Sequence, residues 1–384
     1  MIDGPSALAD LIARARKAEA VGLDTEFVWE RTYYPRLGVV QLSLAEDDVH
    51  LLDAPALGDL SALGELLADA SVVKVLHDAQ QDLTLLARAT GALPRNVFDT
   101  QRAGGFVGLL STLSLQALVN ELVGVHLPKE ETRTDWLRRP LSAKQLAYAE
   151  EDVRYLPRMR RLLLDAAESR GRRAWVEEEM ARYDDPALYN EAPVEEALSR
   201  VKVPGFNRLS GRQRAVLREL AIWREAEARR ADLPRRFVLP DEALGDLARV
   251  GADDLQRLAP LTPKQRERYG RAILTAGERG RTLPPEAWPR SPDRSEDEDV
   301  VAARTLVAQA LVAGRAASEG LDPALVAPKA EVRALVEAGP AADPERHPLL
   351  RGWRRQFVGE DLLRLLGGDA AVALDPDAGW PRLA

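Results

Sequence analysis

Two carboxylates stand two residues apart in an apolar stretch near the beginning of the chain. Asp24 and Glu26 occur in segment 21–27, which has the composition of a short buried strand, and segment 39–44 follows as its hairpin partner. Because side chains alternate along a strand, both carboxylates would lie on one face. Two like charges on a buried strand are unfavourable unless a cation lies between them. The pair is a candidate metal site, and a salt-bridged strand edge is the alternative.

Two later segments supply further groups of the same kind. Asp82 falls where a predicted strand passes into a helix, and Tyr148 and Asp152 are four positions apart. On a helix that spacing stacks both side chains on one face, about one turn apart. If the carboxylates converge, a single pair about 4 Å apart costs about 4 kcal/mol at an effective dielectric of about 20. Such a cluster would be partly protonated or would hold divalent cations. Alone, Tyr148 would be read as a core aromatic.

The composition restricts which metals such a site can bind. The chain has no cysteine and only four histidines, which are scattered. Thiolate sites and disulfides are therefore excluded, and a metal site must be built from oxygen, which favours hard ions such as Mg²⁺ or Mn²⁺. With 384 residues, 46% hydrophobic and 30% charged, the chain belongs with globular proteins of two or three domains.

The order of these segments resembles a known enzyme superfamily. Leu-Asp-Thr-Glu-Phe at 23–27, His-x-x-x-x-Asp-Leu at 77–83 and Tyr-x-x-x-Asp at 148–152 are similar to the three exonuclease motifs of the DEDD superfamily, tyrosine branch. Position 147 is alanine, so the histidine branch, His-x-x-x-x-Asp, does not fit. The longer stretches 31–38 and 132–141 narrow the resemblance to the ribonuclease D family.

The resemblance implies an α/β, ribonuclease-H-like 3'-5' exonuclease domain with a mixed sheet, followed by two small all-α HRDC-like domains. We expect the exonuclease domain at 1–190 and the helical domains at 207–287 and 298–376. Strands alternate with helices from 21 to 97, as an α/β layer architecture requires. The strand order comes from the resemblance alone.

The two helical regions look like diverged copies at an offset of 88 residues. The matched positions are Leu233, Phe237, Val238, Pro240, Leu244 and Leu247 against Leu321, Leu325, Val326, Pro328, Val332 and Leu335. The first copy is basic, and its arginines have no counterparts in the second: Arg229, Arg230, Arg235 and Arg236. We infer phosphate contacts by the first copy, and a solvated helix face is the alternative.

The resemblance also implies the reaction and the roles of the motif residues. We expect a 3'-5' exoribonuclease that releases nucleoside 5'-monophosphates from tRNA precursors and other small structured RNAs with two divalent ions, Mg²⁺ or Mn²⁺. Asp24 would bridge both ions, Glu26 and Asp152 would complete the shell of the first ion, and Asp82 would serve the second ion, directly or through water. Tyr148 would orient the attacking water. A DNA exonuclease and a non-catalytic nucleic-acid-binding scaffold are the alternatives.

Four further residues are candidates for contact with the substrate. Phe27, Gln41 and Trp136 could touch the last nucleotide by stacking or edge recognition, and Lys129 could bind a phosphate. Three neighbouring residues receive other roles. His77 is read as a hydrogen-bonded structural residue, Asp99 as a support for the pocket, and Asp78 as facing elsewhere.

Charge and targeting signals complete the sequence expectations. The net charge of −8 argues against a broad nucleic-acid-coating protein, although local basic patches remain possible. No signal peptide is recognised, and the longest apolar run, 300–314, is interrupted by Arg304. No P-loop pattern occurs. We therefore expect a cytoplasmic monomer that binds RNA with a free 3' end, without a membrane or a nucleotide cofactor.

Overall fold

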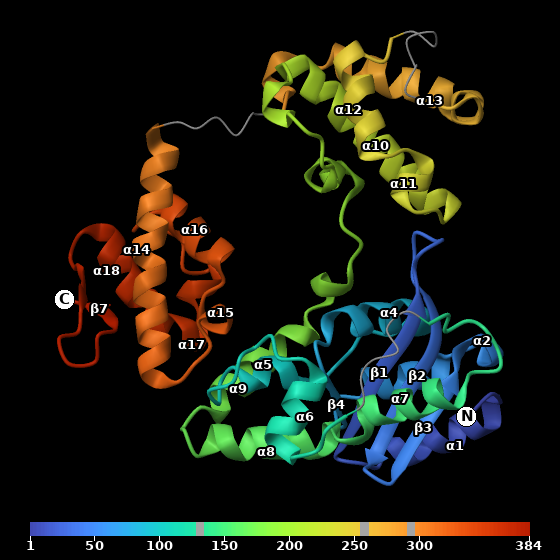
Figure 1. The fold of residues 1–384 in the computed structure, drawn as a ribbon, viewed down its shortest axis with the longest axis vertical. Coiled ribbons are helices and arrows are strands. Elements are labelled where there is room, and N and C mark those ends of the chain that lie inside the picture. The colour runs from blue at the N-terminus through green and yellow to red at the C-terminus, as the bar shows by residue number, and fades with distance from the viewer. Residues whose placement is uncertain (128–133, 254–260, 290–295) are drawn as a thin grey trace. The chain divides into compact units, whose positions relative to one another are not determined.

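The computed structural model describes residues 1–127, 134–253, 261–289 and 296–384 (Figure 1). The chain packs as two compact units. Unit 1 comprises Met1–Phe27, Leu37–Tyr189 and Ser295–Ala384, and unit 2 comprises Val28–Arg36 and Asn190–Arg294. The three-domain division remains a prediction, because the third region packs with the first in unit 1.

Unit 1 is built on a five-stranded mixed sheet, as expected. Its strands lie in the order β3-β2-β1-β4-β5. β2 pairs with β3 antiparallel, whereas β1 pairs with β4 and β4 with β5 in parallel. The strands are β1 Ala20–Val28, β2 Arg36–Ala45, β3 Asp48–Asp53, β4 Val73–Leu76 and β5 Val97–Asp99. The carboxyl ends of the parallel strands β1, β4 and β5 therefore point to the same edge of the sheet.

Nine α-helices accompany this sheet in the part of the chain that the structure describes. They are α1 Pro5–Ala15, α2 Ala54–Leu57, α3 Ser61–Ala68, α4 Gln80–Thr90, α5 Thr100–Gly104, α6 Leu115–Val123, α7 Ala143–Arg154, α8 Leu156–Glu168 and α9 Arg173–Met180. A capping box formed by Ser142 and Gln145 begins α7. Pro157 lies in the first turn of α8, so the predicted break after α7 is confirmed. This break separates the helix that carries Asp152 from the long helix that follows it.

The third region adds a helical layer to unit 1. It consists of α14 Glu296–Glu319, α15 Pro323–Val326, α16 Lys329–Ala338, α17 Gly352–Arg354, α18 Glu360–Gly367 and the hairpin of β6 Val372–Leu374 and β7 Pro381–Leu383. Trp353 is buried, stacks on Trp175 with ring centroids 5.5 Å apart, and meets Phe106 edge-on at 5.0 Å. An aromatic cluster thus joins the third region to the exonuclease region.

A buried charge cluster lies in the same layer. Glu179 accepts hydrogen bonds from Arg102 Nε at 2.9 Å and from Arg354 Nη1 at 2.6 Å. Burial opposes its ionisation, yet Arg354 and Arg102 together lower the pKa of Glu179 to about 2. Glu179 is therefore ionised at neutral pH and holds the two arginines in place.

Helix α14 contains the apolar run 300–314 that Arg304 interrupts. Its residues Glu298–Glu319 have the length and mean hydropathy (1.3) of a membrane span. Within it Ala308, Leu311, Val312 and Ala316 are buried in the hydrophobic core of unit 1. Core helices of globular proteins can have the same length and hydropathy, so these two properties alone do not identify a membrane span.

Unit 2 is helical apart from the segment that joins β1 to β2. Its helices are α10 Gly211–Ala231, α11 Arg235–Val238, α12 Asp241–Val250 and α13 Pro263–Thr282. Leu217, Leu220, Leu244 and Ile273 form the centre of its core. The bounds of α11 and α12 lie 88 residues before those of α15 and α16, which is the offset predicted from the sequence.

Candidate active site

The structure brings together carboxylates from two distant segments. Asp24 and Glu26 on β1 and Asp152 on α7 each offer an oxygen, and these oxygens lie within 4.8 Å of one another. The alternation of β1 places its two carboxylates on one face, and α7 adds the third from more than a hundred residues away. The three acids therefore share one small region of the protein.

Asp82 lies beside this group and contacts β1 through the side chain of Thr25. It is in the first turn of α4, is buried, and accepts a hydrogen bond from the hydroxyl of Thr25. Burial is the main cause of the raised pKa of Asp24 and of Glu26, and the charge of Asp82 raises both further. Asp82 thus belongs to the same electrostatic cluster, although it is not one of the three acids whose oxygens meet.

Without metal ions, ionising all the carboxyl groups of this cluster together is unfavourable. Burial, followed by the charges of Asp152 and Asp82, raises the pKa of Glu26 to about 8. Burial is also the main reason that the pKa of Asp82 rises to about 7 and that of Asp24 rises well above its usual range. The donor set is made entirely of carboxylate oxygens, which suits hard divalent cations. Such cations would permit all four groups to ionise together.

Tyr148 lies one turn before Asp152 on α7. Its ring packs against Trp136 with centroids 6.2 Å apart and an interplanar angle of 37°. Burial and then the charge of Asp152 raise the pKa of Tyr148, and a hydrogen bond to Asp152 acts in the same direction. The phenol therefore keeps its proton at neutral pH, which suits a positioning role better than that of a general base.

A cavity of about 270 Å³ opens over these residues. Its lining residues are Asp24, His77, Asp78, Gln101, Ser114, Leu115, Gln116, Tyr148, Asp152 and Leu156. No motif or spacing in the sequence distinguishes Gln101, Ser114 or Gln116, so none of the three was predicted. The prediction that Asp78 faces elsewhere is wrong, because the left-handed backbone of Asp78 (φ 55°) ends the strand alternation on which it was based.

The end of β4 is held by hydrogen bonds from two side chains. The ring nitrogens of His77 bond to Thr100 Oγ1 and to the Leu113 carbonyl oxygen, both at 3.0 Å, so its structural role is confirmed. Asp99 accepts from the backbone amides of Asp78 and Ala79, both at 3.2 Å. These bonds hold the turn into α4, the helix that carries Asp82.

The residues predicted to contact the nucleotide differ in their exposure. Gln41 and Trp136 are 0% and 2% exposed, so neither presents a surface to a nucleotide, and we withdraw both as substrate contacts. Phe27 is half-buried next to Glu26 and keeps its predicted role. Lys129 lies outside the described residues.

Trp136 instead backs the ring of Tyr148 and is held there by its own loop. Arg139 binds both carboxylate oxygens of Asp53, at 2.6 and 2.7 Å, and donates to the carbonyl oxygens of Trp136 and Gly38. A Cβ at Gly38 would lie 2.5 Å from the Trp136 carbonyl oxygen, so only glycine permits this approach. The stretches 31–38 and 132–141 therefore contribute residues that hold Trp136 against Tyr148.

The four arginines predicted to bind phosphates are not equivalent. Arg229 and Arg235 are turned inward within unit 2, where both pair with the buried Glu225 and donate to the hydroxyl of Tyr33. Their charges are neutralised locally, which the sequence could not reveal, and the prediction for these two is not supported. Arg230 is exposed and pairs with a glutamate one turn away. Arg236 is exposed, and its guanidinium lies 5.3 Å from the ring centre of the half-exposed Phe237.

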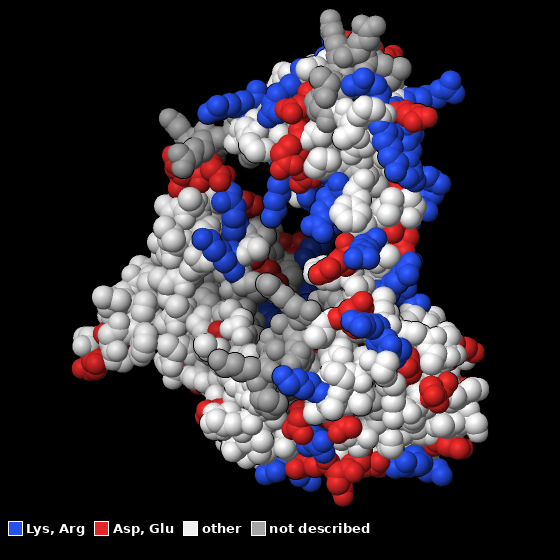
Figure 2. Space-filling model, turned by 45° about the vertical axis from the view of Figure 1, so that its right-hand side comes forward, with Lys and Arg blue, Asp and Glu red and all other residues white. Residues whose placement is uncertain are grey.

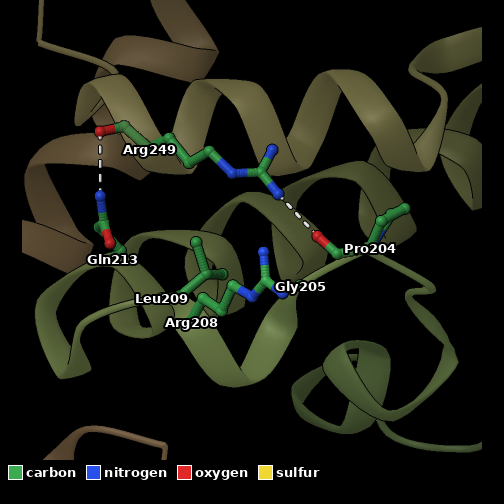
Figure 3. A pocket seen from close by; sticks show the side chains of 6 residues that line it. All are labelled: Pro204, Gly205, Arg208, Leu209, Gln213 and Arg249. Carbon is green, nitrogen blue, oxygen red and sulfur yellow. Dashed lines mark hydrogen bonds between the residues drawn. The ribbon is translucent and has the colours of Figure 1, made fainter.

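A second hollow lies within unit 2. It has a volume of about 580 Å³ and is lined by Pro204, Gly205, Arg208, Leu209, Gln213 and Arg249 (Figure 3). Arg249 donates to the Pro204 carbonyl oxygen at 2.7 Å, and Gln213 donates to the Arg249 carbonyl oxygen at 3.1 Å. None of these six lining residues is a carboxylate or a nucleophile. The hollow can attract an anion but has no groups for hydrolysis.

Comparisons with known proteins agree with this geometry. Residues 1–166 match the 3'-5' exonuclease family, and residues 213–276 match the HRDC domain. The chain is 38% identical over 353 residues to a ribonuclease D from Desulfotalea psychrophila, covering 91% of this chain and 94% of that protein. It is 36% identical over 366 residues to a ribonuclease D from Pseudomonas paraeruginosa, covering 94% and 96%.

A solved structure extends the similarity to the whole fold. The crystal structure of Escherichia coli RNase D, described as an exoribonuclease involved in structured RNA processing, superimposes with a TM-score of 0.84 at 31% identity. The match covers 96% of this chain and 98% of that one. It therefore includes both the α/β region and the helical regions that follow.

Proposed function

The chain belongs to the ribonuclease D family and is a 3'-5' exoribonuclease, and from this premise we propose that it trims the 3' ends of tRNA precursors and other small structured RNAs. The observation that carries the proposal is the group of three carboxylates from β1 and α7 whose oxygens lie within 4.8 Å. The family match to the exonuclease covers both segments. Structured RNA is also the substrate class in the description of the E. coli relative.

The exonuclease fold implies the use of divalent metal ions. We propose that two ions, Mg²⁺ or Mn²⁺, are held by Asp24, Glu26, Asp82 and Asp152. When bound, such ions acidify a water molecule and neutralise the charge that develops on the scissile phosphate. The all-oxygen donor set and the raised pKa values of the metal-free acids support this assignment.

The protein's own groups have separate tasks in this proposal. The four carboxylates bind as anions, so their usefulness depends on losing the protons that burial favours. Tyr148 keeps its proton, and in this proposal its hydroxyl orients the attacking water. Trp136 keeps that ring in position from behind.

We propose that the helical module of unit 2 contacts RNA phosphates through the cations that are not engaged inside the protein. Arg236, beside the exposed ring of Phe237, offers a cation and a stacking surface together. Arg208 lies at the hollow of Figure 3 and is exposed. Figure 2 shows basic and acidic side chains interspersed over the visible face, so local patches of this kind matter more than the net charge of −8.

We propose that the third region is a second, diverged HRDC-like domain. The offset of 88 residues between α11–α12 and α15–α16 supports this assignment. Its Trp353 and Arg354 are used in packing against the exonuclease region, where Arg354 pairs with Glu179. The main role of the third region is therefore to pack against the exonuclease region and stabilise it. We further propose that the protein works as a cytoplasmic monomer.

A mononucleotide-release assay tests the proposed function. The substrate is a tRNA precursor with a short 3' tail, and a DNA strand of the same tail sequence serves for comparison, each with Mg²⁺ and with chelator. We expect 5'-monophosphates from the RNA only with metal. Asp24→Asn should abolish release, whereas Asp10→Asn, at an exposed position on α1, should not. Preference for DNA would reverse the substrate assignment, and full activity of the Asp24 variant would contradict the proposed site.

A further inference from the structure

Gln41 is a buried amide without an evident structural use. It lies near the middle of β2 and is 0% exposed, and neither its side-chain nitrogen nor its oxygen has a hydrogen-bond partner in the described part of the chain. Burying an amide without partners is unfavourable, so most such groups in proteins are satisfied. A methionine or leucine would fill the space without this penalty. The position therefore needs another explanation.

The neighbours of Gln41 show which face of the sheet it occupies. Ser43, two residues further along β2, must lie on the same face. Its hydroxyl donates to the carbonyl oxygen of Val153 at 2.7 Å. Val153 follows Asp152 on α7, so Gln41 lies on the face of the sheet that α7 covers.

The register of the hairpin places Gln41 opposite a candidate metal ligand. A Cβ built on Gly22 of β1 would clash with Ser43 Oγ and would lie 2.9 Å from the Val153 carbonyl oxygen, so Gly22 lies opposite Ser43. β1 and β2 are neighbours joined as a hairpin and run in opposite directions. Asp24 lies two residues after Gly22 on β1, and Gln41 lies two residues before Ser43 on β2. Because the strands are antiparallel, Asp24 and Gln41 are therefore opposite each other. Directly opposed side chains have Cβ atoms about 4.5–5.5 Å apart, which is within reach of a glutamine amide.

We infer that Gln41 is a positioning residue for the carboxylate cluster: its amide nitrogen donates to Asp24 when that carboxylate binds its cations. This inference rests on the proposed function. A buried hydrogen-bond donor fixes which oxygen of the carboxylate faces the ions. The amide does so without adding a charge to a site that already holds four acids. Burial prevents Gln41 from contacting the nucleotide, and it also keeps the amide beside Asp24, where it can position that carboxylate.

Gln41→Met in the full-length protein tests the inference, because methionine has a similar length and no donor. Leu42→Met is the matched control, since it is equally buried on the same strand but faces the opposite side of the sheet. We expect the metal-free Gln41→Met protein to be at least as stable as the wild type. Its affinity for Mn²⁺, measured by calorimetry, should fall about 10- to 100-fold. Its kcat should fall while the KM for RNA stays the same, and Leu42→Met should bind Mn²⁺ normally.

Normal Mn²⁺ affinity and normal kcat in Gln41→Met would overturn the inference and leave Gln41 as a core residue. If that variant does not fold, the wild-type protein labelled with ¹⁵N-glutamine gives the answer. Mg²⁺ should then shift the side-chain amide resonances of Gln41, and unchanged resonances would overturn the inference. Failure of the proposed function is a different result, namely no nucleotide release by the wild type with any metal.

Discussion

Replacing Glu26 with glutamine should stabilise the metal-free protein at alkaline pH and have little effect at acid pH. The carboxyl group is largely buried, and burial together with Asp152 and Asp82 raises its pKa from the ordinary 4.5 to about 8. Between these two values the folded protein keeps a proton that the unfolded chain has lost. Stability of the wild type therefore falls as the pH rises through this window, and the loss is complete above pH 8. Glutamine carries no titrating proton and avoids this loss.

The size of the effect follows from the two pKa values. At 1.36 kcal/mol for each pH unit, ionising Glu26 alone would cost the fold about 5 kcal/mol. Because Asp24, Asp82 and Asp152 share protons with it, the carboxylates titrate as a group, and we expect a measured difference of about 2–4 kcal/mol above pH 8. Below pH 4.5 the two proteins should be equally stable. Adding Mn²⁺ should stabilise the wild type more than the variant, since the cations bind the ionised group.

The measurement is urea denaturation of both proteins in EDTA at pH 5 and pH 8.5, followed by tryptophan fluorescence. Glu30→Gln is the control, because this glutamate is exposed. It should behave like the wild type at both pH values. The reasoning would be refuted if the difference between wild type and Glu26→Gln were the same at pH 5 and pH 8.5. A wild type that gains stability relative to the variant at high pH would reverse the sign and exclude a repulsive cluster.

Three further substitutions test other parts of the structure. Tyr148→Phe keeps the ring but removes the hydroxyl, so kcat for nucleotide release should fall about 100-fold with unchanged Mn²⁺ affinity; equal kcat would make Tyr148 a packing residue. Gly22→Ala forces a Cβ into β2 and α7 and should destabilise the fold by about 1–3 kcal/mol in urea, whereas Gly4→Ala, which meets no atom within 4 Å, should be neutral. Arg354→Ala removes one of the arginines that bind the buried Glu179 and should cost about 1–3 kcal/mol; unaltered stability would show that the remaining arginines suffice.

The local arrangement of the candidate site follows from the sequence because it depends on short periodicities. A spacing of two positions puts Asp24 and Glu26 on one face of a strand, and a spacing of four positions puts Tyr148 and Asp152 on one face of a helix. Neither arrangement depends on the rest of the chain. The absence of cysteine and the scattered positions of the four histidines favour a site built from oxygen. The motif order was sufficient to indicate the family.

Only the tertiary structure decided what each of these groups faces. Asp152 meets Asp24 because α7 packs on the sheet, and Gln41 is buried because the same helix covers its face. Arg229 and Arg235 are arginines on a polar stretch in the sequence, yet both are paired with Glu225 inside unit 2. The sequence shows which residues are charged but not which residues they pair with. Burial and long-range ion pairs arise only when distant segments pack together.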